Sequence, residues 1–148
     1  MNEIQQIIGL FILMAGFVVG LGSVTVIDCL GFLGRKSSYW TETTIRAHKV
    51  TKPLIWLGLF LVIAGGFIFY KDIGFVWQNI YHLITLPIML FVGYFLSFKV
   101  SPFLVQRERD GLSKEILPKN WQINITIAFI FSFMTWWSNL FVLILFLV

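Results

Sequence analysis

The chain has 148 residues, of which 58% are hydrophobic and only 12% charged, with a formal net charge of +4 and a mean hydropathy of +0.87. Soluble domains carry about 25% charged residues, so this composition excludes a water-soluble globule. A membrane-spanning helix needs about 20 apolar residues, and four such spans use nearly the whole chain. The sequence predicts a single transmembrane domain without a separate soluble catalytic domain.

The apolar runs predict an all-α protein, an antiparallel bundle of four transmembrane helices. The first span covers about residues 4–30. It has no basic start and no small-residue cleavage pattern, so we expect it to be retained rather than removed as a signal peptide. Its small residues fall on one face, which predicts a seam where another helix packs closely. These residues are Gly9, Gly16, Gly20, Ser23 and Gly31.

Three further spans and two long polar segments complete the chain. Each polar segment holds five lysines or arginines, whereas the opposite side holds only Lys71. The positive-inside rule then makes both segments cytoplasmic loops and places both termini outside, in a cell membrane of the bacterial inner type. The spans cover about residues 53–70, 75–98 and 121–147, and the polar segments about 34–52 and 99–120.

The polar segments indicate which partners to expect, and the motifs indicate whether to expect catalysis. Basic loops at a membrane surface attract anionic lipid at about 1 kcal/mol per residue, so nucleic-acid binding is not needed to explain them. The sequence has no glycine-rich phosphate loop, no HExxH and no triad spacing, and Cys29 is its only cysteine. We therefore predict no catalytic residues and no metal site. A homo-oligomer formed through the glycine-rich seam is an expectation.

An ionisable residue inside a span is a candidate functional residue, and His82 is the first of these. It lies five residues from Pro87 at the centre of the third span, about 7 Å along the helix axis. On the antiparallel fourth span Ser138 and Asn139 reach the same depth. These three residues are candidates for binding a flat cofactor such as a porphyrin. The alternative is that His82 and Asn139 hydrogen-bond between helices and only hold the bundle together.

A second candidate group lies near the cytoplasmic end of the first span. It combines Asp28 with Lys49 and Lys52, and Arg46 and His48 are nearby. One interpretation is a structural ion pair between Asp28 and one of the three cations. The other is a site for a proton, an ion or an anionic substrate. His48 is expected at the membrane interface rather than as a ligand.

Short segments in all four spans carry a resemblance to known proteins. Through these segments the chain resembles a family of small four-span bacterial membrane proteins. The resemblance implies a four-helix membrane bundle and no particular activity. More distantly it is similar to haem-associated four-span proteins, namely the bacterial membrane protoporphyrinogen oxidase and the copper-resistance D type. The segments are residues 22–28 (GSVTVID), 54–59 (LIWLGL), 98–102 (FKVSP) and 132–138 (SFMTWWS).

The resemblance to the oxidase family implies haem, or another hydrophobic redox ligand, at His82. In that family a tryptophan and a His-x-Lys pattern open the third span, where this chain has Trp77 and His82, with Ile84 in the place of the lysine. Three function classes are therefore open. They are a structural or accessory bundle, a haem- or quinone-linked redox protein using His82, and a small transporter or ion-conducting oligomer using Asp28.

Overall fold

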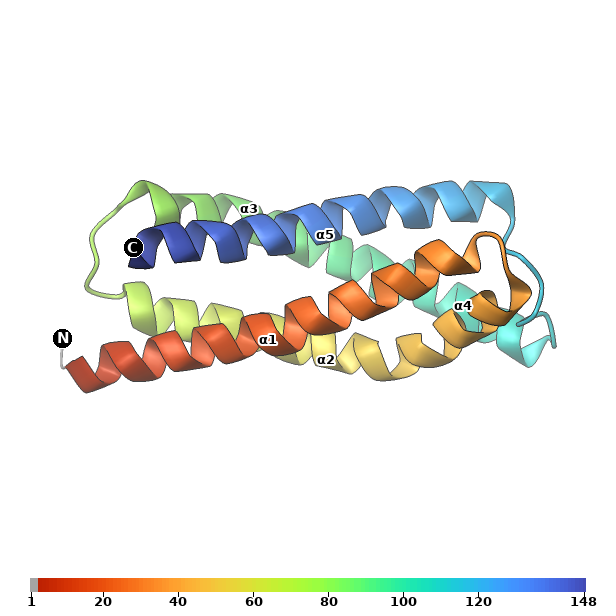
Figure 1. The fold of residues 1–148 in the computed structure, drawn as a ribbon, viewed down its shortest axis with the longest axis horizontal. Helices are drawn as coiled ribbons and strands as arrows, with labels where there is room; N and C mark the ends of the chain where they lie inside the picture. The colour runs from red at the N-terminus through yellow and green to blue at the C-terminus, as the bar shows by residue number, and fades with distance from the viewer. Residues whose placement is uncertain (1–2) are drawn as a thin grey trace.

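The computed structural model describes residues 3–148, which form an antiparallel bundle of long helices without any strand (Figure 1). The helices are α1 (Glu3–Gly34), α2 (Ser38–Tyr70), α3 (Trp77–Phe95), the π-helical turn η1 (Leu96–Val100), α4 (Ser101–Arg109) and α5 (Lys119–Leu147). Both termini and the turn after α2 lie at one end, here named the terminal end. The α1–α2 turn and the loop before α5 lie at the other, here named the basic end.

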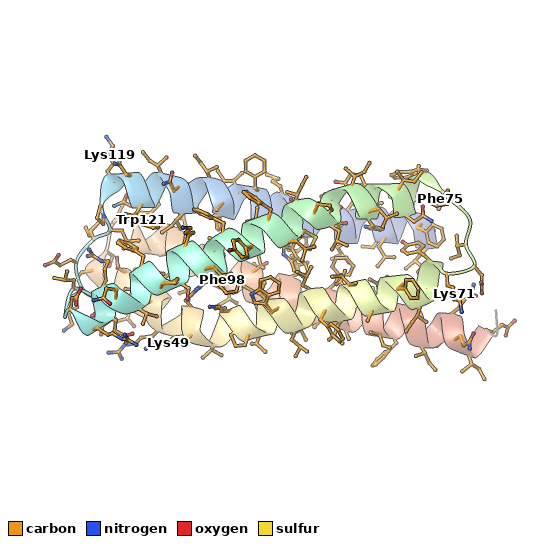
Figure 2. All side chains as sticks on the ribbon, turned by 180° about the vertical axis from the view of Figure 1, so that it is seen from behind. Lys49, Lys71, Phe75, Phe98, Lys119 and Trp121 are labelled. Carbon is orange, nitrogen blue, oxygen red and sulfur yellow. The ribbon has the colours of Figure 1, made fainter. Side chains whose placement is uncertain are left out.

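The predicted four spans are confirmed. The helices α1, α2 and α5, and the continuous helix from α3 through η1 to α4, are each long and apolar enough to cross a membrane. Large apolar side chains such as Phe11 and Phe67 are about three-quarters exposed on the outside of the bundle. Figure 2 shows charged side chains gathered at the two ends, with Lys49 at the basic end and Lys71 at the terminal end. The protein is a multi-pass membrane protein.

The helices extend well beyond the expected spans at the basic end. Most of the segment 34–52 belongs to α2, which begins at Ser38, and the segment 99–120 is helical as far as Arg109. Residues 41–51 are expected to continue the second helix, because Glu42 and Arg46 are spaced i, i+4, and the structure forms both that helix and that ion pair. The helix up to Arg109 is not expected, because hydropathy marks only the part of a helix that sits in hydrocarbon.

The predicted glycine seam is confirmed for Gly9, Gly16 and Gly20, which hold α1 against α2. A β-carbon on Gly16 would lie 2.6 Å from the backbone nitrogen of Val62, and one on Gly9 would lie 2.8 Å from that of Phe69. Gly58 and Gly65 of α2 face α1 in the same way, so the two backbones touch. Gly31 differs, because no atom lies within 4 Å of its β-carbon position.

Polar residues on the facing sides of α3 and α5 pack together and join these two helices. The Thr85 hydroxyl lies 2.8 Å from Asn139 Oδ1, and both residues are buried. Ser132 and Thr135 continue the buried face of α5, whereas Asn124, nearer the start of that helix, is exposed. The bundle therefore consists of two helix pairs, α1 with α2 and α3 with α5.

Candidate functional site

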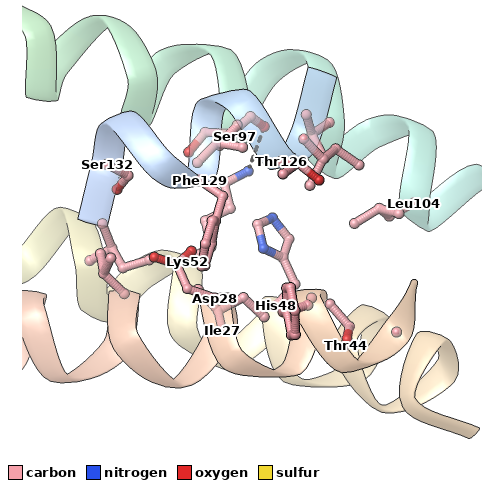
Figure 3. Close-up of a pocket in the computed structure, with 18 of the residues that line it drawn as sticks. Ile27, Asp28, Thr44, His48, Lys52, Ser97, Leu104, Thr126, Phe129 and Ser132 are labelled. Atoms are coloured by element: carbon pink, nitrogen blue, oxygen red, sulfur yellow. Dashed lines mark hydrogen bonds between the residues drawn. The ribbon is translucent and has the colours of Figure 1, made fainter. Parts of the chain in front are cut away.

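A cavity of about 120 Å³ lies between the two helix pairs in the half of the bundle nearer the basic end. It extends from the α1–α2 turn, at Gly34 and Thr41, to Met89 and Trp136. Its walls are largely apolar. The ionisable residues that line it are Asp28 of α1, His48 and Lys52 of α2 (Figure 3), and Arg35 in the turn between these helices. We name this space the basic-end cavity.

Asp28 is the most unusual of these groups, because it is buried and forms no ion pair with any residue in 3–148. The residue is only 6% exposed, and its Oδ2 has no hydrogen-bond partner within the described chain. The ion pair expected from the sequence is not formed: Arg46 binds Glu42 at 2.6 Å, and Lys49 binds Glu108 of α4 at 2.6 Å. An ionised carboxylate left unpaired in a membrane interior is costly, so Asp28 is a group that would bind a proton or a cation.

Lys52 lines the same cavity but reaches across it to the opposite helix. Its Nζ donates to the backbone carbonyl of Ser97 at 3.1 Å, as the dashed line in Figure 3 shows. In the π-helical turn each N–H bonds to the carbonyl five residues earlier, as Ser101 does to Leu96. The next N–H in this pattern, which would bond to the Ser97 carbonyl, belongs to residue 102, and that residue is a proline without an N–H. Lys52 thus supplies the donor that the backbone lacks.

Trp56 lies one turn further along α2 and also bonds to Ser97. Its indole Nε1 donates to the Ser97 hydroxyl at 2.8 Å, so both the main chain and the side chain of Ser97 are held from α2. Sequence reasoning did not identify Ser97 or Trp56 as site residues. Pro102 was the available signal, because a proline just beyond the end of the third span leaves a carbonyl that some other donor must satisfy.

His48 faces the basic-end cavity. Its ring projects into the space between the helix pairs (Figure 3), and its buried Nε2 has no hydrogen-bond partner in the part of the chain that the structure describes. Its expected position at the membrane interface stays a prediction. Lys49, next to it in the sequence, is half-exposed and turned to Glu108, so it lies outside the group of Asp28, His48 and Lys52.

A second cavity, of about 690 Å³, lies toward the terminal end between α1, α2, α3 and the turn at residues 71–75. His82 lines it, and so does Asn139. The two side chains are joined by a hydrogen bond of 2.7 Å between His82 Nδ1 and Asn139 Oδ1. Ser138 does not join them, because its hydroxyl donates to the carbonyl of Thr135 in its own helix at 3.1 Å. We name this space the terminal-end cavity.

The two cavities meet at Met89. Met89 lines both of them, Trp136 lines only the basic-end cavity and Phe17 lines only the terminal-end cavity. The rings of Phe17 and Trp136 meet edge to face with centroids 6.1 Å apart. Gly20 makes room for this arrangement, since a β-carbon there would lie 2.8 Å from Trp136 Cζ3. We name Phe17, Met89 and Trp136 the partition.

The geometry therefore provides two spaces, each with unpaired ionisable or polar groups, at successive depths in one bundle. Residues 3–148 hold no group of three or more His, Cys, Asp or Glu side chains that could bind a metal ion. Comparison with protein-family models, with curated proteins and with solved structures finds no match to this chain.

Proposed function

We propose that the protein transfers protons across the membrane, with Asp28 as the group that binds the proton. The observation that carries this proposal is an unpaired, buried carboxyl group in a cavity that only the partition separates from a second cavity on the other side. Both cavities lie within one chain. The path therefore does not require assembly of several copies.

A proton suits this cavity better than a metal cation does. A proton needs a single acceptor, and Asp28 offers one carboxylate. Calcium, by contrast, takes six to eight oxygen ligands and magnesium a full octahedron. The Lys52 ammonium, held at Ser97, adds a fixed positive charge to the same space and disfavours a second cation there. His48 has a free Nε2 and supplies a neighbouring group that can exchange protons with Asp28 through water.

The distribution of basic residues sets the direction of the path. Five lysines or arginines lie in each of the two polar segments that meet at the basic end. We infer from the positive-inside rule that this end faces the cytoplasm and that both termini face outward. The basic-end cavity then takes protons from or delivers them to the cytoplasmic side, where the cationic surface also attracts anionic lipid.

Proton flux into proteoliposomes tests the proposal. The protein is reconstituted with an entrapped pH-sensitive dye, and a potassium diffusion potential is imposed with valinomycin. We expect the lumen to acidify faster than in protein-free liposomes, and Asp28→Asn to slow the flux by at least about tenfold, because an amide cannot carry the proton. Asp110→Asn is the matched control, since Asp110 is exposed in the loop after α4 and should leave the flux unchanged.

Two outcomes would overturn the proposal. A parent flux no greater than that of protein-free liposomes would leave the structural or accessory bundle as the better interpretation, in which the polar groups only hold helices together. A flux that Asp28→Asn leaves intact would remove the carboxyl group from the path. The reconstituted protein is checked for helix content by circular dichroism, so that a misfolded variant is not mistaken for an inactive one.

A further inference from the structure

We propose that the terminal-end cavity binds the ring of a lipid-soluble quinol. The cavity has about 690 Å³ of space, within the 300–1,000 Å³ typical of small-molecule pockets. Its walls include Leu13, Val62, Leu83 and Leu86, which suit a hydrophobic ligand. Neither Asp28 nor His48 lines it, whereas Phe17 and Met89 of the partition do. The inference therefore shares the two-cavity layout of the proposed function, and Asp28→Asn, tested below, distinguishes the failure of one from the failure of the other.

Polar atoms without partners are concentrated around this cavity. Three of the seven buried side-chain atoms that have no hydrogen-bond partner in residues 3–148 belong to residues that line it: Tyr70 Oη, Asn79 Oδ1 and His82 Nε2. A buried polar atom that stays unpaired is costly, because it has lost its hydrogen bonds to water. Three at one cavity with apolar walls point to a ligand that pairs with them.

The donor or acceptor role of each atom follows from its neighbours. Asn139 Nδ2 donates to the Thr135 carbonyl at 2.7 Å, so Asn139 Oδ1 can only accept. His82 Nδ1, 2.7 Å from that oxygen, must therefore carry the hydrogen, and His82 Nε2 is left as an acceptor. Asn79 Nδ2 donates to the Gly74 carbonyl at 2.9 Å, so Asn79 Oδ1 is an acceptor too.

Residues that line the cavity thus carry two unpaired acceptors, His82 Nε2 and Asn79 Oδ1, and one unpaired donor, the Tyr70 hydroxyl, all buried within its wall. A quinol matches this set, because its ring carries two hydroxyl groups that donate and oxygens that also accept. The oxidised quinone has no hydroxyl group and would leave both acceptors unpaired. A haem would use His82 Nε2 alone and leave Asn79 Oδ1 unpaired. The geometry therefore favours the reduced form of a quinone-type ligand over the quinone and over haem.

The helix arrangement also gives such a ligand a route from the bilayer. The helix α2 packs on α1 and α3 packs on α5, and Figure 2 shows α2 and α3 diverging toward Lys71 and Phe75 at the terminal end. The terminal-end cavity lies between these two helices and their connecting turn. A ring with an apolar tail can enter from the lipid side while the tail stays among exposed side chains such as Phe67.

Calorimetric titration of the detergent-solubilised protein with a decyl-substituted benzoquinol tests the inference. We expect saturable binding to the parent, and binding of the matching benzoquinone at least about tenfold weaker. Tyr70→Phe should weaken quinol binding without destabilising the fold, because the hydroxyl it removes has no partner within the protein. Tyr81→Phe is the matched control, since Tyr81 does not line the cavity.

His82→Phe should also weaken quinol binding, whereas Asp28→Asn should leave it unchanged, which separates this inference from the proton-transfer proposal. The inference is overturned if no saturable quinol binding occurs, if the quinone binds as tightly as the quinol, or if Tyr70→Phe and His82→Phe bind the quinol like the parent. Titration with hemin tests the alternative ligand. If the parent binds no quinol but gives a Soret band that His82→Phe abolishes, the ligand of this cavity is a porphyrin and the inference is overturned.

Discussion

Gly16→Ala gives the sharpest test of how the bundle is held together. The added methyl group would lie 2.6 Å from the backbone nitrogen of Val62 and 2.8 Å from the Gly58 carbonyl oxygen. Ordinary van der Waals contact begins at 3.4 Å, so α1 and α2 must separate locally by about 0.8 Å, a gap in the range that already forfeits a quarter to a half of each dispersion contact. Backbone atoms cannot swing aside as a side-chain tip can, so the whole contact shifts.

The magnitude follows from two opposing effects. Overpacking of this kind costs about 1–3 kcal/mol, while alanine in place of glycine within a helix gains about 0.5–1 kcal/mol. We therefore expect Gly16→Ala to lower the free energy of unfolding by about 1 kcal/mol, and by at most about 2.5 kcal/mol. Gly22 in the same helix has no atom within 4 Å of its β-carbon position. Gly22→Ala should therefore only raise the free energy of unfolding, because alanine is the better helix former.

Reversible unfolding in mixed micelles of dodecyl sulfate and a mild detergent, followed by tryptophan fluorescence, measures both variants against the parent. The comparison between two alanines in one helix cancels the effect of helix propensity. The reasoning fails if Gly16→Ala is as stable as Gly22→Ala. In that event the backbones would not touch along the seam as the structure has them.

Three further predictions concern the partition, the α3–α5 contact and the basic end. Trp136→Ala should join the two cavities and raise the proton flux several-fold in the liposome assay, whereas Trp137→Ala, on the lipid side, should not. Asn139→Leu removes the acceptor shared by two side chains of α3, so the free energy of unfolding should fall by about 1–3 kcal/mol. Asn124→Leu is the control, because Asn124 is exposed. Glu108→Gln breaks a partly exposed ion pair with α2 and should cost less than about 1 kcal/mol.

Each of these has a result that would contradict it. A flux in Trp136→Ala equal to that of the parent would mean that other side chains close the path. Equal unfolding energies for the two asparagine variants would mean that the hydrogen bonds to α3 contribute nothing net. A loss well above 1 kcal/mol on breaking the ion pair, insensitive to salt, would mean that α4 is held by a buried pair rather than an exposed one.

The arrangement of the helices was largely predictable because it depends on patterns along single helices. Glycines every three to four residues on one face identify a close backbone contact whatever the partner helix is, and Gly16 and Gly20 make that contact with α2. Polar residues on one face of an apolar helix must turn inward, and this placed His82 opposite Asn139. In both cases membrane physics leaves few alternatives.

The pairing of charges at the basic end could not be predicted in the same way. Arg46, Lys49 and Lys52 were all candidates for Asp28, and the sequence does not say which acids compete for them. In the structure Glu42 takes Arg46 and Glu108 takes Lys49. The second of these acids lies in α4, which hydropathy had left in a loop. A helix that continues past the apolar run therefore changed the partners available to a residue in α1.

The unpaired state of Asp28 follows from Pro102 through Lys52. Proline has no N–H, so the π-helical turn before it leaves the Ser97 carbonyl without a backbone donor. A bare carbonyl in a membrane interior is costly, and the Lys52 ammonium satisfies it from across the cavity. The ammonium is then committed to α3 and does not pair with Asp28. If this reasoning holds, Pro102→Ala restores a donor to the helix, releases Lys52 to pair with Asp28, and suppresses the proton flux without touching the carboxyl group itself.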